Sequence, residues 1–147
     1  MTKKMITLSR LKDARRRLRD VAAGAHAVAD AHRLQATDAH SVAVQVLTDE
    51  LDGAFARLEA ASDVRTLFRF EDDVHAARAG VHVAALVVAK AEAESERRRA
   101  ALASRARDLK LTEELYERSR DAFAKAEQKH EQKLSDDLGA TRAARGE

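Results

Sequence analysis

The stretch EAASDVRTLFRF, residues 59–70, decides the fold, because a long helical pattern is interrupted there by a good helix start. Ser62 and Asp63 are residue types favoured as helix N-caps, and an apolar stripe resumes directly after them. We therefore place a reversal of the chain at about residues 60–63. Neither glycine nor proline forces a turn there, so one continuous helix is the structural alternative.

The rest of the composition is that of long helices. The chain has 147 residues, no proline, five glycines and only 3% aromatic residues. A sheet protein would need turn residues about every ten positions, and the sequence lacks them. We predict an all-α fold: a long antiparallel two-helix coiled-coil hairpin, whose second helix is longer and projects beyond the first.

The expected boundaries follow from capping residues and from the extent of the apolar stripes. The first arm covers about residues 7–60, the turn about 60–63 and the second arm about 63–138. Gly139 follows Leu138 as a plausible C′ glycine, so residues 139–147 are expected to be a disordered tail. All of these form a single helical-hairpin domain.

The second arm carries one seven-residue register without a break. Strict spacing of this kind over many turns predicts a left-handed supercoil. The residues of this register are Leu67, Val74, Val81, Val88, Ser95, Leu102, Leu109, Tyr116, Phe123 and His130.

The first arm shows a similar stripe of smaller residues, which suggests close helix approach. After Val46 this register slips to Leu47 and Leu51, consistent with a stutter, near the helix-weakening Gly53. The stripe consists of Leu11, Ala14, Leu18, Val21, Ala25, Val28, His32, Gln35, Ala39, Val42 and Val46.

The two arms are unequal in length. Folding the chain at residue 62 places Leu11 opposite Thr112, where the first arm ends. The last 20 or so residues of the second helix then project, at about 1.5 Å per residue, and Tyr116 and Phe123 lack an internal partner helix. Exposed aromatic residues of this kind predict binding to another protein, or self-association as the alternative.

Basic residues form two blocks that are far apart in sequence. Residues 1–20 hold eight Lys or Arg and two Asp, and residues 97–110 hold six Lys or Arg and one Asp. The antiparallel fold is expected to bring both blocks to the free end. Such runs can bind nucleic-acid phosphates, but no aromatic residues are interleaved, so a solvated face or an acidic protein partner is favoured over nucleic acid.

No catalytic, cofactor-binding or metal-binding residues are expected. The six histidines never occur at the i, i+3 or i, i+4 spacing that lets one helix face bind a metal, and there is no cysteine or glycine-rich phosphate loop. No window approaches the run of roughly 18 apolar residues that spans a bilayer. We expect a soluble, cytoplasmic, non-enzymatic protein without direct membrane insertion.

Several stretches resemble the FliJ/YscO family of type III secretion proteins. The C-terminal stretch RDLKLTEELYERSRDAFAKAEQKHEQKLSDD, residues 107–137, is similar to the family's charged series E-x-x-x-E-x-K-x-x-D-[ED]. Leu8, Leu11 and Arg15 fit its L-x-x-L-x-x-x-R opening. VRTLFRFEDDV, residues 64–74, looks like the start of the family's second helix. The alanine-rich first arm departs from the family's usual glutamate-rich one.

The resemblance implies a central stalk, similar in shape to the γ subunit of rotary ATP synthases, in a flagellar or injectisome export apparatus. Such a protein inserts into the hexameric export ATPase, promotes its assembly and activity, and links it to the export-gate membrane protein at the inner membrane. Export chaperones are a further implied partner. On its own the chain is expected to be a monomer.

The candidate site residues combine the basic blocks, the projecting aromatic residues and the matched charges. For ring binding they are Arg15, Arg16, Arg17, Arg98, Arg99, Tyr116, Phe123, Glu127, Glu131, Lys133, Asp136 and Asp137. For the export gate the resemblance implies Phe68, Phe70 and Val74. The alternatives are a self-associating structural coiled coil, or an amphipathic helical protein that binds surfaces or nucleic acid.

Overall fold

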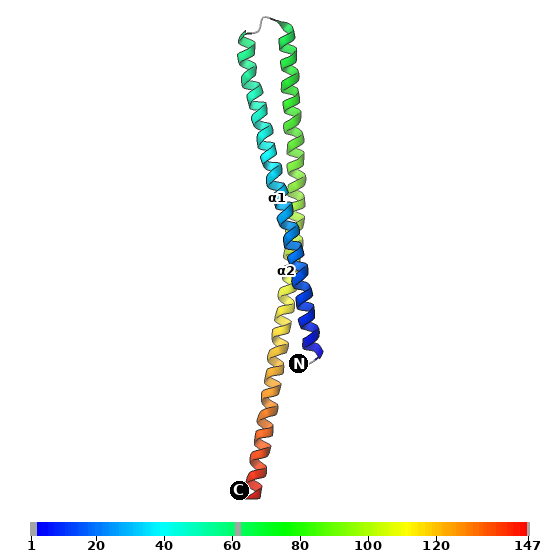
Figure 1. Ribbon diagram of the computed structural model, residues 1–147, viewed down its shortest axis with the longest axis vertical. Coiled ribbons are helices and arrows are strands. Elements are labelled where there is room, and N and C mark those ends of the chain that lie inside the picture. Colours follow the sequence, from blue (N-terminus) through cyan, green and yellow to red (C-terminus); the bar gives the residue numbers. More distant parts are fainter. Residues whose placement is uncertain (1–2, 61–62, 147) are drawn as a thin grey trace. The chain divides into compact units, whose positions relative to one another are not determined.

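The protein folds as a helical hairpin (Figure 1). The computed structural model describes residues 3–60 and 63–146, and for residues 142–145 the backbone alone. Helix α1 spans Lys3–Ala60 and helix α2 spans Val64–Arg145. The helices pack against each other in antiparallel order, since Arg15 contacts Thr112 whereas Asp30 contacts Ser95. The predicted all-α hairpin is confirmed.

The chain divides into two compact units. The first combines Met1–Asp20 with Ala103–Glu147, and the second is Val21–Leu102. We call them the terminal unit and the turn unit. Each unit contains a piece of both helices, so each has its own helix–helix contact.

Asp63 begins the second helix as its N-cap. Its side-chain Oδ1 accepts a hydrogen bond of 3.2 Å from the backbone N–H of Arg65, and its carbonyl accepts one of 3.2 Å from the N–H of Thr66. These bonds satisfy donors that a helix start leaves without an intrahelical partner. The capping role predicted for Asp63 is confirmed, while Ser62 and the remaining turn position 61 lie outside the described residues.

Both helices are longer at their outer ends than the sequence analysis expected. Helix α1 begins at Lys3 rather than at about residue 7. Helix α2 continues through Gly139 to Arg145, so its predicted end at residue 138 and the disordered tail are wrong. One glycine costs only about 1 kcal/mol in a helix, and the alanines and arginines after it favour helix. The left-handed glycine is Gly146, with φ of 72°.

The seam of α2 follows the predicted register. Leu67 and His130, the first and last members of that register, are exposed. The residues between them are buried or half-buried, which confirms the seven-residue period as the packing face of α2. They are Val74, Val81, Val88, Ser95, Leu102, Leu109, Tyr116 and Phe123.

The seam of α1 lies one residue away from the predicted stripe. Its members recur at alternating steps of three and four without a slip, so the predicted stutter after Val46 is also wrong. Alanines occupy every seventh position from Ala22 to Ala43, and their small side chains let α2 approach α1 closely. The seam residues are Met5, Leu8, Lys12, Arg15, Arg19, Ala22, His26, Ala29, Arg33, Ala36, His40, Ala43, Leu47, Glu50 and Ala54.

One stretch of α2, within Val64–Thr141, is long and apolar enough to cross a membrane by length and composition alone. This finding corrects the expectation that no window approaches such a run. Core helices of soluble proteins pass the same test, so the stretch is weak support for a membrane span. It is only 6% buried, and exposed apolar side chains of α2 include Val83, Leu86 and Val87.

Candidate protein-binding surfaces

A buried polar cluster joins the helices in the terminal unit. Thr112 is fully buried, and its hydroxyl donates a hydrogen bond of 2.8 Å to the carbonyl of Asp108. The guanidinium of Arg15 donates from Nη1 to the same carbonyl, at 2.8 Å, and to Thr112 Oγ1. We call Arg15, Asp108 and Thr112 the terminal latch. Arg15 therefore serves the contact between the helices.

Two neighbouring contacts extend this interface. Arg16 Nη2 lies 3.3 Å from Glu113 Oε1, and Lys12 Nζ lies 4.4 Å from the centroid of the Tyr116 ring. A cation over an aromatic ring is attracted by the negative face of the ring. Tyr116 thus has an internal partner, and the prediction that it lacks one is wrong.

The pairing of the helices at this end is offset from the simple fold at residue 62. Leu11 was expected opposite Thr112, but Arg15 contacts Thr112 instead. Helical side chains lean towards the N-terminus of their own helix. The long side chains of Lys12 and Arg15 therefore reach towards higher residue numbers of α2, and the first arm covers α2 further than was predicted.

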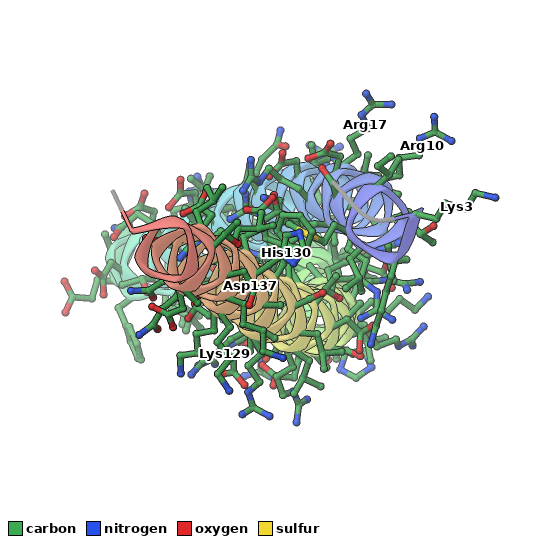
Figure 2. All side chains as sticks on the ribbon, turned by 90° about the horizontal axis from the view of Figure 1, so that it is seen from below. Lys3, Arg10, Arg17, Lys129, His130 and Asp137 are labelled. Atoms are coloured by element: carbon green, nitrogen blue, oxygen red, sulfur yellow. The ribbon has the colours of Figure 1, made fainter. Side chains whose placement is uncertain are left out.

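The distal segment, residues 124–141 of α2, is exposed at every position. It follows the half-buried Phe123, so the predicted projection exists but begins later than residue 112. Its labelled residues Lys129, His130 and Asp137 can be followed in Figure 2. The ring-binding candidates within it are Glu127, Glu131, Lys133, Asp136 and Asp137.

Two leucines break the charged character of the distal segment. Leu134 is 50% exposed and Leu138 is 64% exposed. They lie four residues apart, which places them on one face of the helix. The candidate residues predicted from the sequence do not include this pair, although the four-residue spacing of the two leucines is enough to identify it.

The first basic block keeps an exposed face on α1. Lys3, Arg10 and Arg17 are spaced seven residues apart, and Figure 2 shows their side chains pointing away from the helices. Of the predicted cluster Arg15–Arg17, only Arg17 belongs to this exposed face. Arg16 is exposed but paired with Glu113.

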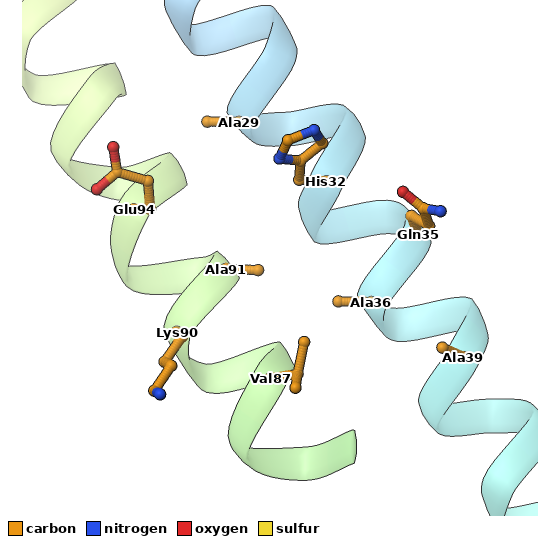
Figure 3. A pocket seen from close by; sticks show the side chains of 9 residues that line it. All are labelled: Ala29, His32, Gln35, Ala36, Ala39, Val87, Lys90, Ala91 and Glu94. Atoms are coloured by element: carbon orange, nitrogen blue, oxygen red, sulfur yellow. The ribbon is translucent and has the colours of Figure 1, made fainter. Parts of the chain in front are cut away.

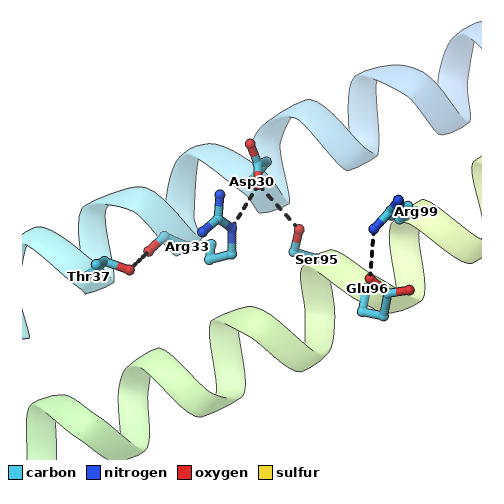
Figure 4. Close-up of polar contacts among 6 residues, drawn as sticks. All are labelled: Asp30, Arg33, Thr37, Ser95, Glu96 and Arg99. Atoms are coloured by element: carbon cyan, nitrogen blue, oxygen red, sulfur yellow. Dashed lines mark hydrogen bonds and ion pairs between the residues drawn. The ribbon is translucent and has the colours of Figure 1, made fainter.

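The second basic block is divided between the two units. Its first part, residues 97–99, lies in the turn unit and pairs with acids on its own helix: Arg98 Nε is 2.7 Å from Glu94 Oε1, and Arg99 Nη1 is 3.7 Å from Glu96 Oε2, as Figure 4 shows for the latter pair. Its second part, residues 105–110, belongs to the terminal unit with the first block. Exposed pairs of this kind contribute about 0–1 kcal/mol each, as expected for a solvated helix face.

A second polar cluster crosses the helix interface within the turn unit (Figure 4). Asp30 Oδ1 accepts a hydrogen bond of 2.8 Å from Arg33 Nε and one of 3.5 Å from the Ser95 hydroxyl. The bond from Arg33, together with its charge, lowers the pKa of Asp30 below the usual value, against a smaller opposing effect of burial. The sequence analysis placed Ser95 on the seam but missed Asp30.

The three export-gate candidates differ in their exposure and in whether they line a hollow. Phe70 and Val74 line a hollow of about 320 Å³ together with Phe55 and Leu58. Val74 is buried and Phe70 half-buried, whereas Phe68 is 64% exposed and does not line the hollow. We call this the turn hollow. Antiparallel pairing brings Phe55 and Leu58 there, which the sequence analysis could have derived from its own register.

Neither a cluster of metal-binding residues nor a similarity to a known protein points to a further site in the described part of the chain. Across residues 3–60 and 63–146, no group of three or more His, Cys, Asp or Glu is placed to hold a metal ion. No protein-family model, curated protein or solved structure matches the chain.

Proposed function

We propose that the protein is a non-enzymatic adaptor of a type III secretion system, located in the cytoplasm at the inner membrane. In this proposal the distal segment inserts into the hexameric export ATPase and promotes the assembly and activity of the ATPase ring. The hairpin links this ring to the export gate. The observation that carries the proposal is a helix with every residue exposed from 124 to 141. A partner that packs against such a helix would stabilise it.

The distal segment has the features of a helix that docks into a groove. Leu134 and Leu138 supply an apolar pair on one face, and Glu131 and Asp137 flank them with charge. Amphipathic helices bind grooves through anchors spaced three or four residues apart. Phe123, at the start of the segment, is half-buried and adds a further apolar group.

Three of the candidate ring-binding residues are already engaged in the packing of the terminal unit. Arg15, Arg16 and Tyr116 hold α1 to α2, so their role is to position the distal segment. Direct contact with the ring is proposed for the distal segment, with Arg17 as a supporting cation.

Contact with the export gate is proposed for the turn hollow. Its lining includes Phe55, Leu58 and Phe70, and the exposed Phe68 belongs to the same N-terminal part of α2. An apolar hollow with aromatic walls suits an apolar side chain of a partner. The buried Val74 would support the wall and would not reach the partner directly.

The proposal is tested by mixing the full chain with the cognate export ATPase and measuring turnover and hexamer formation. Leu134→Glu with Leu138→Glu is expected to lower stimulation at least about 10-fold, because two carboxylates would enter an apolar groove. The matched control is Leu111→Glu with Leu115→Glu, an exposed pair of the same spacing on the same helix. Unchanged turnover with the wild-type chain would contradict the proposal.

A further inference from the structure

Within the turn unit, the stripe that the sequence analysis assigned to the helix seam is exposed at every position except Ala25, which is half-buried. Val21 is 71% exposed and Val42 is 63% exposed, although the stripe repeats with the strict three–four spacing of a coiled-coil seam. We call it the valine stripe. Its members are Val21, Ala25, Val28, His32, Gln35, Ala39, Val42 and Val46.

Three adjacent hollows follow the valine stripe along α1. The largest, about 560 Å³, is lined by His32, Gln35 and Ala39 from α1 and by Val87 from α2 (Figure 3). A second, about 360 Å³, includes Val46, and a third, about 400 Å³, includes Val28. Most members of the stripe, though not Val21 or Val42, therefore line a row of hollows beside α2, which we call the groove; charged side chains such as Lys90 and Glu94 line it as well.

The valine stripe is complementary to itself when it is reversed. When two copies pair in antiparallel orientation, a valine lies opposite a valine at each end of the stripe. In the layers between the ends and the centre, a valine of one copy lies opposite an alanine of the other. Antiparallel coiled coils pair their two seam positions in this alternating way. The opposing pairs are Val21 with Val46, Ala25 with Val42, Val28 with Ala39, and His32 with Gln35.

The centre of this arrangement is polar. His32 of each copy lies opposite Gln35 of the other, and an imidazole and an amide can each donate and accept a hydrogen bond. A polar layer in an apolar seam fixes the register, because any shift would bury these groups without partners. The sequence thus specifies one register for the antiparallel pair.

We propose that the valine stripe binds the same stripe of a second copy of this chain, in antiparallel orientation and with His32 and Gln35 at the two-fold axis. The dimer contact lies in the turn unit and uses residues outside the distal segment, so this inference and the proposed function can each fail without the other. The half-exposed Val87 of α2 belongs to the opposite wall of the largest hollow, which the second copy covers.

A lipid surface suits the stripe less well than a second copy does. His32 and Gln35 stand at its midpoint, and Lys90 and Glu94 line the same hollow. Polar and charged groups are costly to place in an apolar lipid phase. In the dimer the two central groups meet each other, and the charged side chains remain at the edge of the groove.

Sedimentation of the full chain over the micromolar range tests the proposal. The wild type is expected to form a reversible dimer. Val28→Glu with Val42→Glu is expected to raise its dissociation constant at least about 100-fold with helicity unchanged, because four carboxylates would enter the seam. Val44→Glu is the matched control, since Val44 is an exposed valine on the opposite face of α1 and should leave the dimer intact.

Disulfide formation tests the orientation, because the natural chain contains no cysteine. A mixture of Val28→Cys and Ala39→Cys chains should form the mixed disulfide readily, whereas Val28→Cys alone should not, since its two copies would lie several turns apart. A wild-type monomer at all concentrations, efficient self-linkage of Val28→Cys, or loss of helicity in the double glutamate variant would each overturn the proposal. Binding of the monomer to lipid vesicles without dimer formation would do the same.

Discussion

At the scale of single residues, long cations perform a task that apolar side chains usually perform. Lys12, Arg15 and Arg19 occupy seam positions of α1, where a coiled coil normally carries leucine or valine. Arg15 bonds to the carbonyl of Asp108 and to the buried Thr112. Hydrogen bonds to charged groups are stronger than neutral ones, so Arg15, with Lys12 over the Tyr116 ring, helps to hold the helices together where the apolar core is small.

Thr112→Val tests the terminal latch. The substitution keeps the shape of the side chain but removes the acceptor that Arg15 uses, and we expect a loss of about 1–2 kcal/mol in the free energy of unfolding by urea. Thr48→Val is the control, because the exposed Thr48 bonds only to the carbonyl of Val44 within its own helix. Equal stability of the two variants would contradict a stabilising latch.

Asp30 should make the stability depend on pH. Its pKa is lowered in the folded chain, mainly by the hydrogen bond from Arg33. The stabilisation is therefore fully present above the unfolded pKa of about 3.9 and is lost as the pH falls through the lower, folded value. Between pH 7 and pH 3, the urea midpoint of Asp30→Asn should fall less than that of the wild type.

The control for this pH effect is Asp38→Asn, an exposed aspartate on the same helix. It should retain the wild-type fall in the urea midpoint. If Asp30→Asn and the wild type lost the same stability on acidification, the contact with Arg33 would not contribute.

At the scale of helices, α1 has two stripes with the same period, and only one of them faces α2. The inner stripe carries alanines such as Ala29 and Ala36, each 8% exposed, and the outer one carries larger residues such as Val28 and Val42. Small side chains allow the helix axes to approach closely. The alanines at every seventh position therefore favour the inner stripe as the seam, although His26, Arg33 and His40 alternate with them.

Ala36→Leu tests this assignment. Adding a larger side chain at a closely packed position should destabilise the hairpin by about 1–3 kcal/mol, measured by thermal or urea unfolding. Ala27→Leu is the matched control, because Ala27 is exposed on the same helix and leucine is also a good helix former. A stabilised Ala36→Leu chain would show that α1 presents another face to α2.

The two helices differ in how far their sequences predict their packing. In α2 the seam contains Val74, Val81 and Val88, so the strongest apolar period is also the packing face, and its register was predicted correctly. In α1 the strongest apolar period is the valine stripe, which α2 does not cover. A hydropathy pattern ranks the valine stripe above the alanine seam, because valine is more apolar than alanine. The packing of α1 on α2 through alanines depends instead on how closely the two helices approach, which hydropathy does not measure.

The candidate sites were predictable to a similar, partial extent. The unequal lengths of the arms predicted a projecting segment beyond about residue 112, and the structure shows continuous exposure only from residue 124 to 141. Arg15, Arg16 and Tyr116 were assigned to a partner because sequence position alone does not show the reach of a long side chain. The structure joins them across the helix interface instead. The ring, the export gate and the dimer remain proposals, and the experiments above test the ring contact and the dimer separately.

At the scale of the whole molecule, the surfaces are distributed between the two units. The terminal unit contains the latch and the distal segment, and the turn unit contains the valine stripe and the turn hollow. The net charge is only +2 in 147 residues, so overall charge selects no class of partner. Local patterns of exposure have to supply specificity.

Deleting residues 125–147 should leave the folded hairpin intact. Every described side chain from residue 125 to 141 is exposed, so its removal uncovers little apolar surface, and we expect the free energy of unfolding by urea to change by no more than about 0.5 kcal/mol. Circular dichroism should show the loss of the deleted turns only. A large fall in the midpoint would mean that the segment packs against the rest of the chain.

The terminal latch also has a kinetic consequence, because it joins residues that are 97 positions apart in the chain. Contacts near the turn close short loops, whereas the latch closes a far longer one, and longer loops lose more entropy on closure. The arms should close from the turn during folding, so that the latch and the Lys12–Tyr116 contact beyond it form late and open early. Fraying would then begin beyond the latch, at Lys12 and Tyr116, and reach Arg15 and Thr112 next while the rest of the hairpin stays closed.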